Sequence, residues 1–543
     1  MKPWQKHYDP GVPETLKYPD WTISDLLEMT VSKHPNYLAV CFNDLEITYK
    51  ELLFKVIGLA NGLKHLGIQK RDRIALLLPN SPTYVVAYYA VVKLGAIVAN
   101  INVMNHGEEL KRILNHSEVK AVVTLDIFLK NVTDIVSETS VEHILIHSVF
   151  GMEKEIVNPD QLPPIHIVND LVERFGNQGC ETEAQPDDIA VLQYTSGVTG
   201  TPKAAILTHR TLISNLIQID SWNTRKTTEN RAVLCIIPFF HVFGMTVCMH
   251  VSILSGYKMV LFPQFDWSSV ISILDAIRKY NPISFPAVPA LWSALVSSSE
   301  VKRADLSSIE VASGGGAPLS IDIQEKHHKL TGNFISQAYG LSEVSSTAVI
   351  SPFINGKISE SVGLPLPDTD IKIVGLDNRD KECKQGDIGE IAIKGPQVMK
   401  GYWQDEEKTN RSLEDGWLFT SDLGYMDEQG YLYLVDRKDD LIISKGFNVY
   451  PSQIEETLKK HPGIQDAVVV GRDDPKRGQS ITACLISAID SKPDRKELST
   501  FCHQHLADYQ VPRTFKFVED IPKNKIGKPL RRLLREELDS VEE

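Results

Sequence analysis

A buried strand that leads directly into a loop of glycines, hydroxyls and one lysine constrains this chain more than any other feature. Residues 189–194 are a short apolar run typical of a buried strand, and residues 194–203 have the sequence YTSGVTGTPK. Glycines let the backbone approach an oxyanion and turn its N–H groups toward it. Hydroxyls add donors, and Lys203 adds a mobile positive charge. The segment therefore predicts a polyphosphate-binding loop at the end of a strand.

This loop differs from the G-x-x-x-x-G-K-[ST] loop of P-loop nucleotidases. Gly200 is followed by Thr-Pro-Lys, and the Gly-Lys pairs that begin at Gly356 and Gly527 are followed by Ile and Pro rather than by Ser or Thr. On composition alone, a loop rich in Ser, Thr and Gly is more often only a solvated loop. The functional interpretation of this loop therefore depends on the rest of the chain.

Length, charge and cysteine usage narrow the class of protein. A chain of 543 residues is too long for one compact core, so we expect two or more domains. The net charge of −13 argues against nucleic-acid binding and attachment to anionic membranes. The apolar stretch 84–104 is interrupted by Lys93, the N-terminus lacks a secretory core, and the scattered cysteines contain no C-x-x-C pair. We expect a cytoplasmic protein without a zinc site or an integral membrane segment, for which peripheral membrane contact stays open.

Helical and strand patterns alternate through most of the first 280 residues. Such alternation is typical of a mostly parallel sheet that is covered by helices. Capping residues and apolar periodicity mark the helices, and short apolar runs mark the strands. The predicted helices are 22–33, 49–66, 81–94 and 267–279, and the predicted strands are 73–78, 96–99, 120–124 and 232–237.

The pattern changes in the last third of the chain. Residues 362–434 contain short strands and turns, which predict a β-rich subdomain. A charged break at 436–440 precedes a segment with two helices and two strands. We predict an α/β fold with a large N-terminal domain of helix-covered sheets over residues 1–436, and a small α+β C-terminal domain over residues 437–543. The predicted elements of that small domain are helices at 451–460 and 495–507 and strands at 467–470 and 480–486.

Five further motifs follow the loop in order. They are PFFHVFGM at 238–245, SGGGAPL at 313–319, QAYGLSE at 337–343, GWLFTSDLG at 416–424 and PKNKIGKPLR at 522–531. Each alone is typical of a core residue, a turn or a solvated basic loop. Together with the loop they resemble, over essentially the whole chain, the adenylate-forming superfamily of acyl-CoA synthetases, peptide-synthetase adenylation domains and firefly luciferase. Val198 and Ala204 replace the Thr and Gly that are usual in the loop, so one hydroxyl donor is lost.

The resemblance implies a nucleotide site. The loop would hold the phosphates of ATP, and the glycine-rich segment would lie against the adenine, because glycines let a flat base stack on the backbone. Asp422 would accept hydrogen bonds from both ribose hydroxyls, and Arg437 would bridge to the ribose or a phosphate. The implied nucleotide-binding residues are Thr195, Ser196, Gly197, Thr199, Gly200, Thr201, Lys203, Gly315, Gly316, Ala317, Gln337, Tyr339, Gly340, Ser342, Asp422 and Arg437.

The resemblance also implies catalytic roles for three side chains. Glu343, with Thr195, would hold Mg²⁺, a hard ion that prefers oxygen ligands. Lys528 would contact the carboxylate and the α-phosphate and stabilise charge as the bond forms. His241 would line the acyl pocket beside the reacting carboxylate and position or gate the substrate.

A second implied reaction uses coenzyme A. The small C-terminal domain would be mobile and turn about Asp439, a hinge-type transition. Lys528 would leave the active site, and the segment of Lys445, Gly446 and Phe447 would bring coenzyme A, whose thiol attacks the acyl carbonyl. The resemblance therefore implies an AMP-forming acid–thiol ligase that uses ATP, Mg²⁺ and coenzyme A.

The acid substrate is predicted from the pocket and from local similarity. The N-terminal residues and residues 124–128 resemble those of bacterial long-chain fatty-acid–CoA ligases, so we predict a medium- or long-chain fatty acid. An aryl acid such as coumarate stays an alternative, and a non-catalytic acyl-adenylate binding protein is an alternative of another class. A luciferase-like side reaction on the bound adenylate and the oligomeric state, including a homodimer, stay open. The predicted pocket residues are His241, Phe240, Val242, Phe243, Val344 and Ala348, which are mostly apolar and include small residues.

Overall fold

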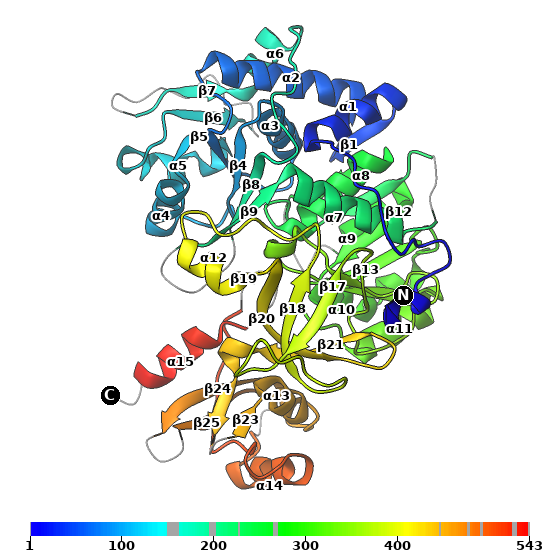
Figure 1. Cartoon of the computed structure of the whole chain (residues 1–543), viewed down its shortest axis with the longest axis vertical. Coiled ribbons are helices and arrows are strands. Elements are labelled where there is room, and N and C mark those ends of the chain that lie inside the picture. Colours follow the sequence, from blue (N-terminus) through cyan, green and yellow to red (C-terminus); the bar gives the residue numbers. More distant parts are fainter. Residues whose placement is uncertain are drawn as a thin grey trace. The chain divides into compact units, whose positions relative to one another are not determined.

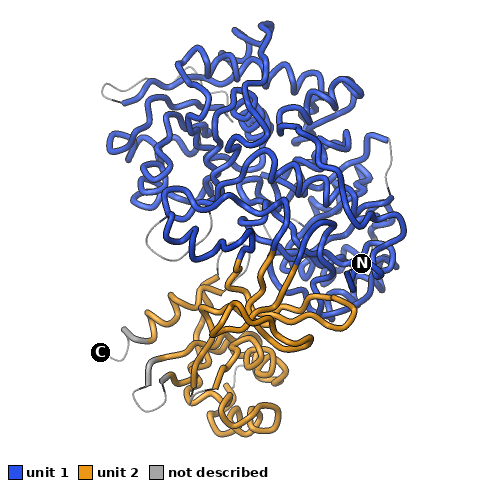
Figure 2. The backbone as a smooth tube through the Cα atoms, in the orientation of Figure 1, with its two compact units in different colours: residues 1–370, 394–418 blue, residues 371–393, 419–543 orange. Residues whose placement is uncertain are grey.

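The computed structural model forms two compact units (Figure 2). Unit 1 comprises Met1–Asp370 and Lys394–Leu418, and unit 2 comprises Ile371–Ile393 and Phe419–Glu543. A mobile domain that begins at residue 437 and turns about Asp439 stays a prediction. The structure describes residues 2–148, 162–194, 202–225, 229–263, 270–444, 447–474, 478–488, 492–523 and 529–540.

Unit 1 contains a seven-stranded sheet with the strand order β7-β6-β5-β3-β4-β8-β9 (Figure 1). Its strands run parallel, except that β9 is antiparallel to β8. The central strands are almost entirely buried, as expected where helices cover both faces of a parallel sheet. The strands are β3 (Arg73–Leu77), β4 (Ile97–Asn100), β5 (Val119–Leu125), β6 (His143–His147), β7 (Ile165–Ile167), β8 (Ile189–Tyr194) and β9 (Ala204–Thr208).

The first helices of unit 1 begin where the sequence supplies capping groups. Thr22 and Asp25 form a capping box, as do Thr48 and Glu51, and Ser81 caps a helix whose first residue is a proline. These caps satisfy backbone N–H groups that have no partner within the helix. The helices are α1 (Ile23–Lys33), α2 (Tyr49–His65), α3 (Pro82–Lys93), α4 (Gly107–Ser117), α5 (Leu129–Thr133) and α6 (Val168–Phe175).

A nine-stranded sheet forms the other half of unit 1, with the order β16-β15-β14-β13-β12-β10-β11-β1-β2. Its six central strands pair in parallel, and β2, β15 and β16 are antiparallel to their neighbours. The strands are β1 (Leu38–Phe42), β2 (Leu45–Thr48), β10 (Ala232–Cys235), β11 (Lys258–Leu261), β12 (Pro282–Ala287), β13 (Val311–Gly315), β14 (Ile335–Tyr339), β15 (Val349–Ile350) and β16 (Leu364–Pro365).

Helices pack on this second sheet around a large apolar core. Trp292 of α10 and Ile277 of α9 join a buried cluster with Leu234 and Phe285 of the strands. A π-helical segment, η5, continues into α8 and contributes to the cavity described below. The helices of this half are α7 (His209–Trp222), η5 (Phe243–His250), α8 (Val251–Ser255), α9 (Val270–Tyr280), α10 (Pro289–Ser297) and α11 (Ile321–Thr331).

Two smaller sheets carry the last third of the chain. One has the order β17-β18-β20-β19, with β21 paired to β20, and the other has the order β23-β22-β25-β24, with β26 paired to β25. Their strands are β17 (Asp370–Val374), β18 (Gly389–Lys394), β19 (Leu413–Glu414), β20 (Trp417–Met426), β21 (Leu432–Arg437), β22 (Ile442–Ser444), β23 (Phe447–Val449), β24 (Ile464–Asp474), β25 (Gly478–Ser487) and β26 (Thr514–Phe517). The helices of this region are α12 (Glu406–Ser412), α13 (Pro451–Lys459), α14 (Arg495–His505) and α15 (Arg531–Ser540).

The predicted α/β class is confirmed, and the predicted helices and strands are found within a few residues of their expected bounds. The largest difference is in the C-terminal hairpin, where β24 extends beyond 467–470 at both ends because its residues continue the antiparallel ladder with β25. Residues 267–269 of the predicted helix 267–279 lie outside the described residues. In the part of the chain that the structure describes, no helix has the length and apolar character needed to cross a membrane.

Candidate active site

The predicted phosphate loop joins two neighbouring strands. β8 ends at Tyr194, β9 begins at Ala204, and these two residues are register partners in an antiparallel pair. The strand that the sequence predicts before the loop is therefore confirmed. Within the loop itself, Thr195, Ser196, Gly197, Thr199, Gly200 and Thr201 lie outside the described residues, as do Lys445, Gly446 and Lys528.

Lys203 and Glu343 meet inside unit 1. The Nζ atom of Lys203 lies 2.8 Å from Oε1 of Glu343. The hydroxyl of Tyr402 donates to the same oxygen at 2.7 Å, and the lysine ammonium lies 4.3 Å from the centre of the Tyr402 ring. The structure thus brings together the lysine that ends the loop motif and the carboxylate of the QAYGLSE motif, which are 140 residues apart.

The environment of Glu343 keeps its carboxyl group ionised. Burial by itself would raise the pKa of Glu343. The positive charge of Lys203 and the hydrogen bonds from Lys203 and Tyr402 outweigh burial, so the pKa lies below its usual value. An ionised carboxylate is a suitable ligand for Mg²⁺, which proteins commonly hold through one or two carboxylates together with substrate phosphates and water.

Tyr402 belongs to a strap, residues 399–403, that is hydrogen-bonded both to Glu343 and to β9, the strand that follows Lys203. The N–H of Met399 donates to the carbonyl of Glu343 at 2.8 Å. Further along the strap, the N–H of Ile206 in β9 donates to the carbonyl of Gly401 at 2.9 Å, and the N–H of Trp403 donates to the carbonyl of Ala204 at 2.9 Å. The strap therefore fixes the distance between β9, which follows Lys203, and the loop that carries Glu343. Sequence reasoning missed Tyr402, because the contact depends on this long-range pairing.

The glycines of the two adenine-side motifs permit close backbone approach. A Cβ atom on Gly340 would lie 1.7 Å from the carbonyl oxygen of Ser346, so no other residue fits there. Gly316 has φ +85°, which favours glycine. Gly315 ends β13 and Tyr339 ends β14, and these parallel strands are neighbours, so the two motifs lie at the same carboxyl edge of the sheet.

The structure also describes Gln337 and Ser342 of the predicted nucleotide-binding set. Gln337 is buried, and its side-chain amide donates to the carbonyls of Ser359 and Ser361 at 2.6 and 3.0 Å. Ser342 begins the short 3₁₀ turn η8 (Ser342–Val344) that presents Glu343. Ala317 directly follows Gly316, and its contact with a nucleotide stays a prediction, as do those of Gln337 and Ser342.

His241 is neutral near pH 7. Burial lowers the pKa of its imidazole to about 4. Its Nδ1 atom accepts a hydrogen bond from the N–H of Phe243 at 3.2 Å, which leaves the proton on Nε2. A neutral imidazole with an Nε2–H group can donate one hydrogen bond to a substrate oxygen, which is compatible with the predicted positioning role.

An apolar cavity of about 450 Å³ lies between the η5–α8 helix and the second sheet of unit 1. Of the predicted pocket residues, Phe243 lines it. A Cβ atom on Gly315 would lie 3.6 Å from the Phe243 ring and 3.2 Å from the carbonyl oxygen of Ala338. Val242, Val344 and Ala348 are buried in the surrounding core, and neither they nor Phe240 and His241 are among the residues that line the cavity. The apolar lining is Ile219, Val233, Phe243, Val247, Val251, Leu254, Tyr257, Ile283, Val311, Ala338, Ile350 and Phe353.

Apart from Phe243, the lining residues were not predicted from the sequence, although one wall of the cavity has a periodic sequence pattern. Phe243, Val247, Val251 and Leu254 recur at intervals of four, four and three residues, the spacing of one helical face. The opposite wall has no such signal, because Ser284 and Ser313 come from separate strands. Their small side chains leave room beside the helix.

In unit 2 the predicted ribose residues are register partners. Asp422 of β20 pairs with Arg437 of β21, and Nε of Arg437 lies 3.2 Å from Oδ1 of Asp422. Asp439 lies in the 3₁₀ turn Lys438–Asp440. Phe447 is 53% exposed and stacks on Tyr509 with ring centres 4.5 Å apart.

Comparison with known proteins is consistent with this geometry. Family models described as "AMP-binding enzyme" and "AMP-binding enzyme C-terminal domain" match residues 27–403 and 453–528. The chain is 37% identical to a long-chain-fatty-acid–CoA ligase of Bacillus subtilis, over 99% of this chain and 98% of that protein. It is 32% identical to 4-coumarate–CoA ligase 2 of Nicotiana tabacum, over 90% and 89% of the two chains. The crystal structure of ATP-bound MatB from Rhodopseudomonas palustris superposes with a TM-score of 0.85 at 27% identity, over 96% of this chain and 100% of that one.

Proposed function

The chain belongs to the AMP-binding enzyme family, and on that premise we propose that it is an ATP-dependent ligase that joins a medium- or long-chain fatty acid to coenzyme A. The observation that carries the choice of acid is the apolar cavity of about 450 Å³. It begins at Phe243, against Gly315 at the carboxyl edge of the sheet, where the nucleotide motifs lie. A volume in this range suits a sizeable apolar ligand.

The first half-reaction joins the acid to the nucleotide. The carboxylate attacks the α-phosphate of ATP, which yields an acyl-adenylate and pyrophosphate. No side-chain nucleophile is needed, because positioning and charge neutralisation lower the barrier. Glu343, held by Lys203 and Tyr402, and the loop residue Thr195 would hold Mg²⁺, which when bound neutralises phosphate charge. Lys528 would add positive charge at the α-phosphate and the attacking carboxylate.

The second half-reaction transfers the acyl group. The thiol of coenzyme A attacks the acyl carbonyl, a thioester bond forms, and the bond to AMP breaks. We propose that residues 437–543 turn about Asp439 between the two half-reactions, so that Phe447 and its neighbours replace Lys528. The exposure of Phe447 supports a role in contact with another group.

Mg²⁺ dependence and cytoplasmic location are further parts of this proposal. The ionised carboxylate of Glu343 supports the first, since Mg²⁺ prefers oxygen ligands. The second is supported by the cysteines, all seven of which are free thiols.

An aryl acid is the second candidate substrate. The similarity to the tobacco 4-coumarate–CoA ligase supports this candidate. The motifs named above do not distinguish ligases for aryl acids from ligases for fatty acids. A non-catalytic acyl-adenylate binding protein is the third candidate, and it would show no turnover.

The test is coenzyme-A-dependent release of AMP from ATP with acetate, octanoate, palmitate, oleate, benzoate and coumarate. We expect the highest kcat/KM with the longer aliphatic acids. A maximum at benzoate or coumarate would replace the fatty acid by an aryl acid. No AMP with any acid, combined with binding of acyl-adenylate, would support the non-catalytic alternative. Lys528→Ala serves as the mechanistic control: it should lose adenylate formation and largely keep acyl transfer from preformed acyl-adenylate.

A further inference from the structure

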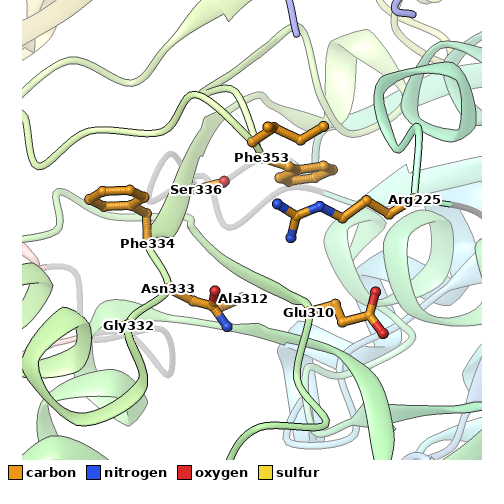
Figure 3. Close-up of a pocket in the computed structure, with 9 residues that line it drawn as sticks. Arg225, Glu310, Ala312, Gly332, Asn333, Phe334, Ser336 and Phe353 are labelled. Atoms are coloured by element: carbon orange, nitrogen blue, oxygen red, sulfur yellow. The ribbon is translucent and has the colours of Figure 1, made fainter. Parts of the chain in front are cut away.

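Two cavities of unit 1 meet at one aromatic side chain. The larger is the apolar cavity of about 450 Å³ described above. The smaller, of about 190 Å³, is lined by charged and polar groups that include Arg225, Glu310, Asn333 and Ser336 (Figure 3). Phe353 lines both cavities, and no other described residue does so. Its ring therefore separates an apolar space from a charged one.

Phe353 lies at the end of the apolar cavity away from the nucleotide motifs. At the near end, Ala338 of β14 is the register partner of Ile350 in β15. β15 runs antiparallel to β14, and the next two residues keep that direction: the N–H of Ser351 donates to the carbonyl of Gln337, and the hydroxyl of Ser336 donates to the carbonyl of Pro352. Phe353, the next residue, therefore lies further toward the amino ends of the sheet strands than Ile350. An acyl chain whose carboxylate is at the carboxyl edge of the sheet would extend toward Phe353.

The loop that carries Phe353 is held by a buried carboxylate from the N-terminal segment. Asp9 is 2% exposed and accepts hydrogen bonds from the backbone N–H groups of residues 353–355 at 2.6, 2.8 and 2.8 Å. The indole of Trp222 donates to the carbonyl of Ser351 at 3.2 Å. With these partners the backbone on both sides of Phe353 is fixed, which fixes the position from which its ring extends.

We propose that Phe353 ends the acyl cavity and limits the length of the acyl chain, and that Asp9 is the positioning residue that holds it in place. This inference rests on the proposed function, because it assumes that the cavity takes the acyl group. The physical reason is the contrast across the ring. Burial of a methylene group in the apolar cavity lowers the free energy of binding. In the smaller cavity the same group would displace solvent from Arg225 and Glu310, which is unfavourable.

The experiment measures kcat/KM of the full-length enzyme for octanoate, laurate, palmitate, arachidate and behenate. We expect the wild type to reach a limit, beyond which added methylenes lower kcat/KM. Phe353→Ala should move that limit to longer acids and raise kcat/KM for the first excluded acid, relative to palmitate, by about tenfold or more. Phe353→Leu, a milder change, should give an intermediate shift. Octanoate should be unaffected, because a short chain does not reach Phe353.

Two further variants separate the wall from general loosening of the loop. Ile354→Ala removes a neighbouring apolar side chain that lines only the smaller cavity, so its profile should match the wild type. Asp9→Asn keeps the shape of the side chain and removes its charge. The fall in kcat/KM beyond the limit should therefore become less steep, through a change in KM for the long acids, while kcat for octanoate stays unchanged. Equal loss with all acids would indicate that Asp9 acts only in folding and would overturn its positioning role.

The remaining outcomes distinguish this inference from the function beneath it. If the wild type activates no fatty acid, the proposed function fails, and the chain-length role fails with it. If the wild type has a limit that neither Phe353 variant moves, the function stands and the role of Phe353 is overturned. The limit would then lie at the polar rim of the cavity, which includes Lys33 and Asn223. A shift of the same size in Ile354→Ala would also overturn the role of Phe353 as the end wall.

Discussion

Glu343 in unit 1 and Asp422 in unit 2 are both predicted ligand-binding carboxylates, yet their surroundings differ. The Glu343 side chain is 8% exposed and has two donors on one oxygen. The Asp422 side chain is 21% exposed and faces Arg437, which is 42% exposed. The first carboxylate is held in one place by partners that are themselves fixed. Solvent screens the partner of the second carboxylate, Arg437, so the ion pair is weak. A ribose hydroxyl can therefore replace Arg437 as the partner of Asp422 with little loss of free energy.

The largest effect that this comparison predicts is the loss of adenylate formation in Glu343→Gln. Removal of the charge leaves Lys203 without its counter-ion and removes the proposed metal ligand. We expect kcat for ATP–pyrophosphate exchange to fall by about 10²–10³-fold. Acyl transfer from preformed acyl-adenylate should change far less. Equal loss of both half-reactions would contradict the assignment of Glu343 to the first one.

Tyr402→Phe should have the next largest effect, because it removes one hydrogen bond to an ionised group. We expect the KM for ATP to rise by about tenfold, equivalent to roughly 1.4 kcal/mol, with little change in the KM for the acid. Initial-rate kinetics with each substrate varied in turn would measure this split. If both KM values rise together, Tyr402 supports the whole site rather than Glu343 in particular.

Asp422→Asn should separate binding from stability. The pair with Arg437 is partly exposed, so its loss should change the free energy of unfolding by less than about 1 kcal/mol. The KM for ATP should nevertheless rise, because an amide accepts fewer hydrogen bonds from the ribose. Chemical denaturation measures the change in stability, and nucleotide titration measures the change in binding. A large stability loss would erase the contrast with Glu343.

The smallest predicted effect concerns Ser421, which precedes Asp422 and has φ +61°. This is a left-handed conformation, which glycine adopts more readily than serine. Ser421→Gly should therefore raise the free energy of unfolding by up to about 1 kcal/mol, because relief of strain exceeds the added chain entropy. A thermal melt measures it, and a decrease would show that the serine hydroxyl contributes more than the strain costs.

Local sequence patterns were sufficient for the bounds of most helices and strands. Capping residues at Thr22, Thr48 and Ser81 mark helix starts that the structure confirms. Patterns were insufficient for the apolar cavity of unit 1. Its helix wall has a periodic signal, but Ser284 and Ser313 become wall residues only because β12 and β13 are neighbours in the sheet.

The sequence by itself determined the family, the α/β class and the order of the chemical groups along the chain, because these depend on local spacing and residue type. Only the tertiary structure decided which groups share an atom. The meeting of Lys203 and Tyr402 at Oε1 of Glu343, and the hold of Asp9 on the loop of Phe353, join residues separated by 59 to 346 positions. Such contacts depend on sheet order and long-range backbone pairing, which residue spacing along one chain does not encode.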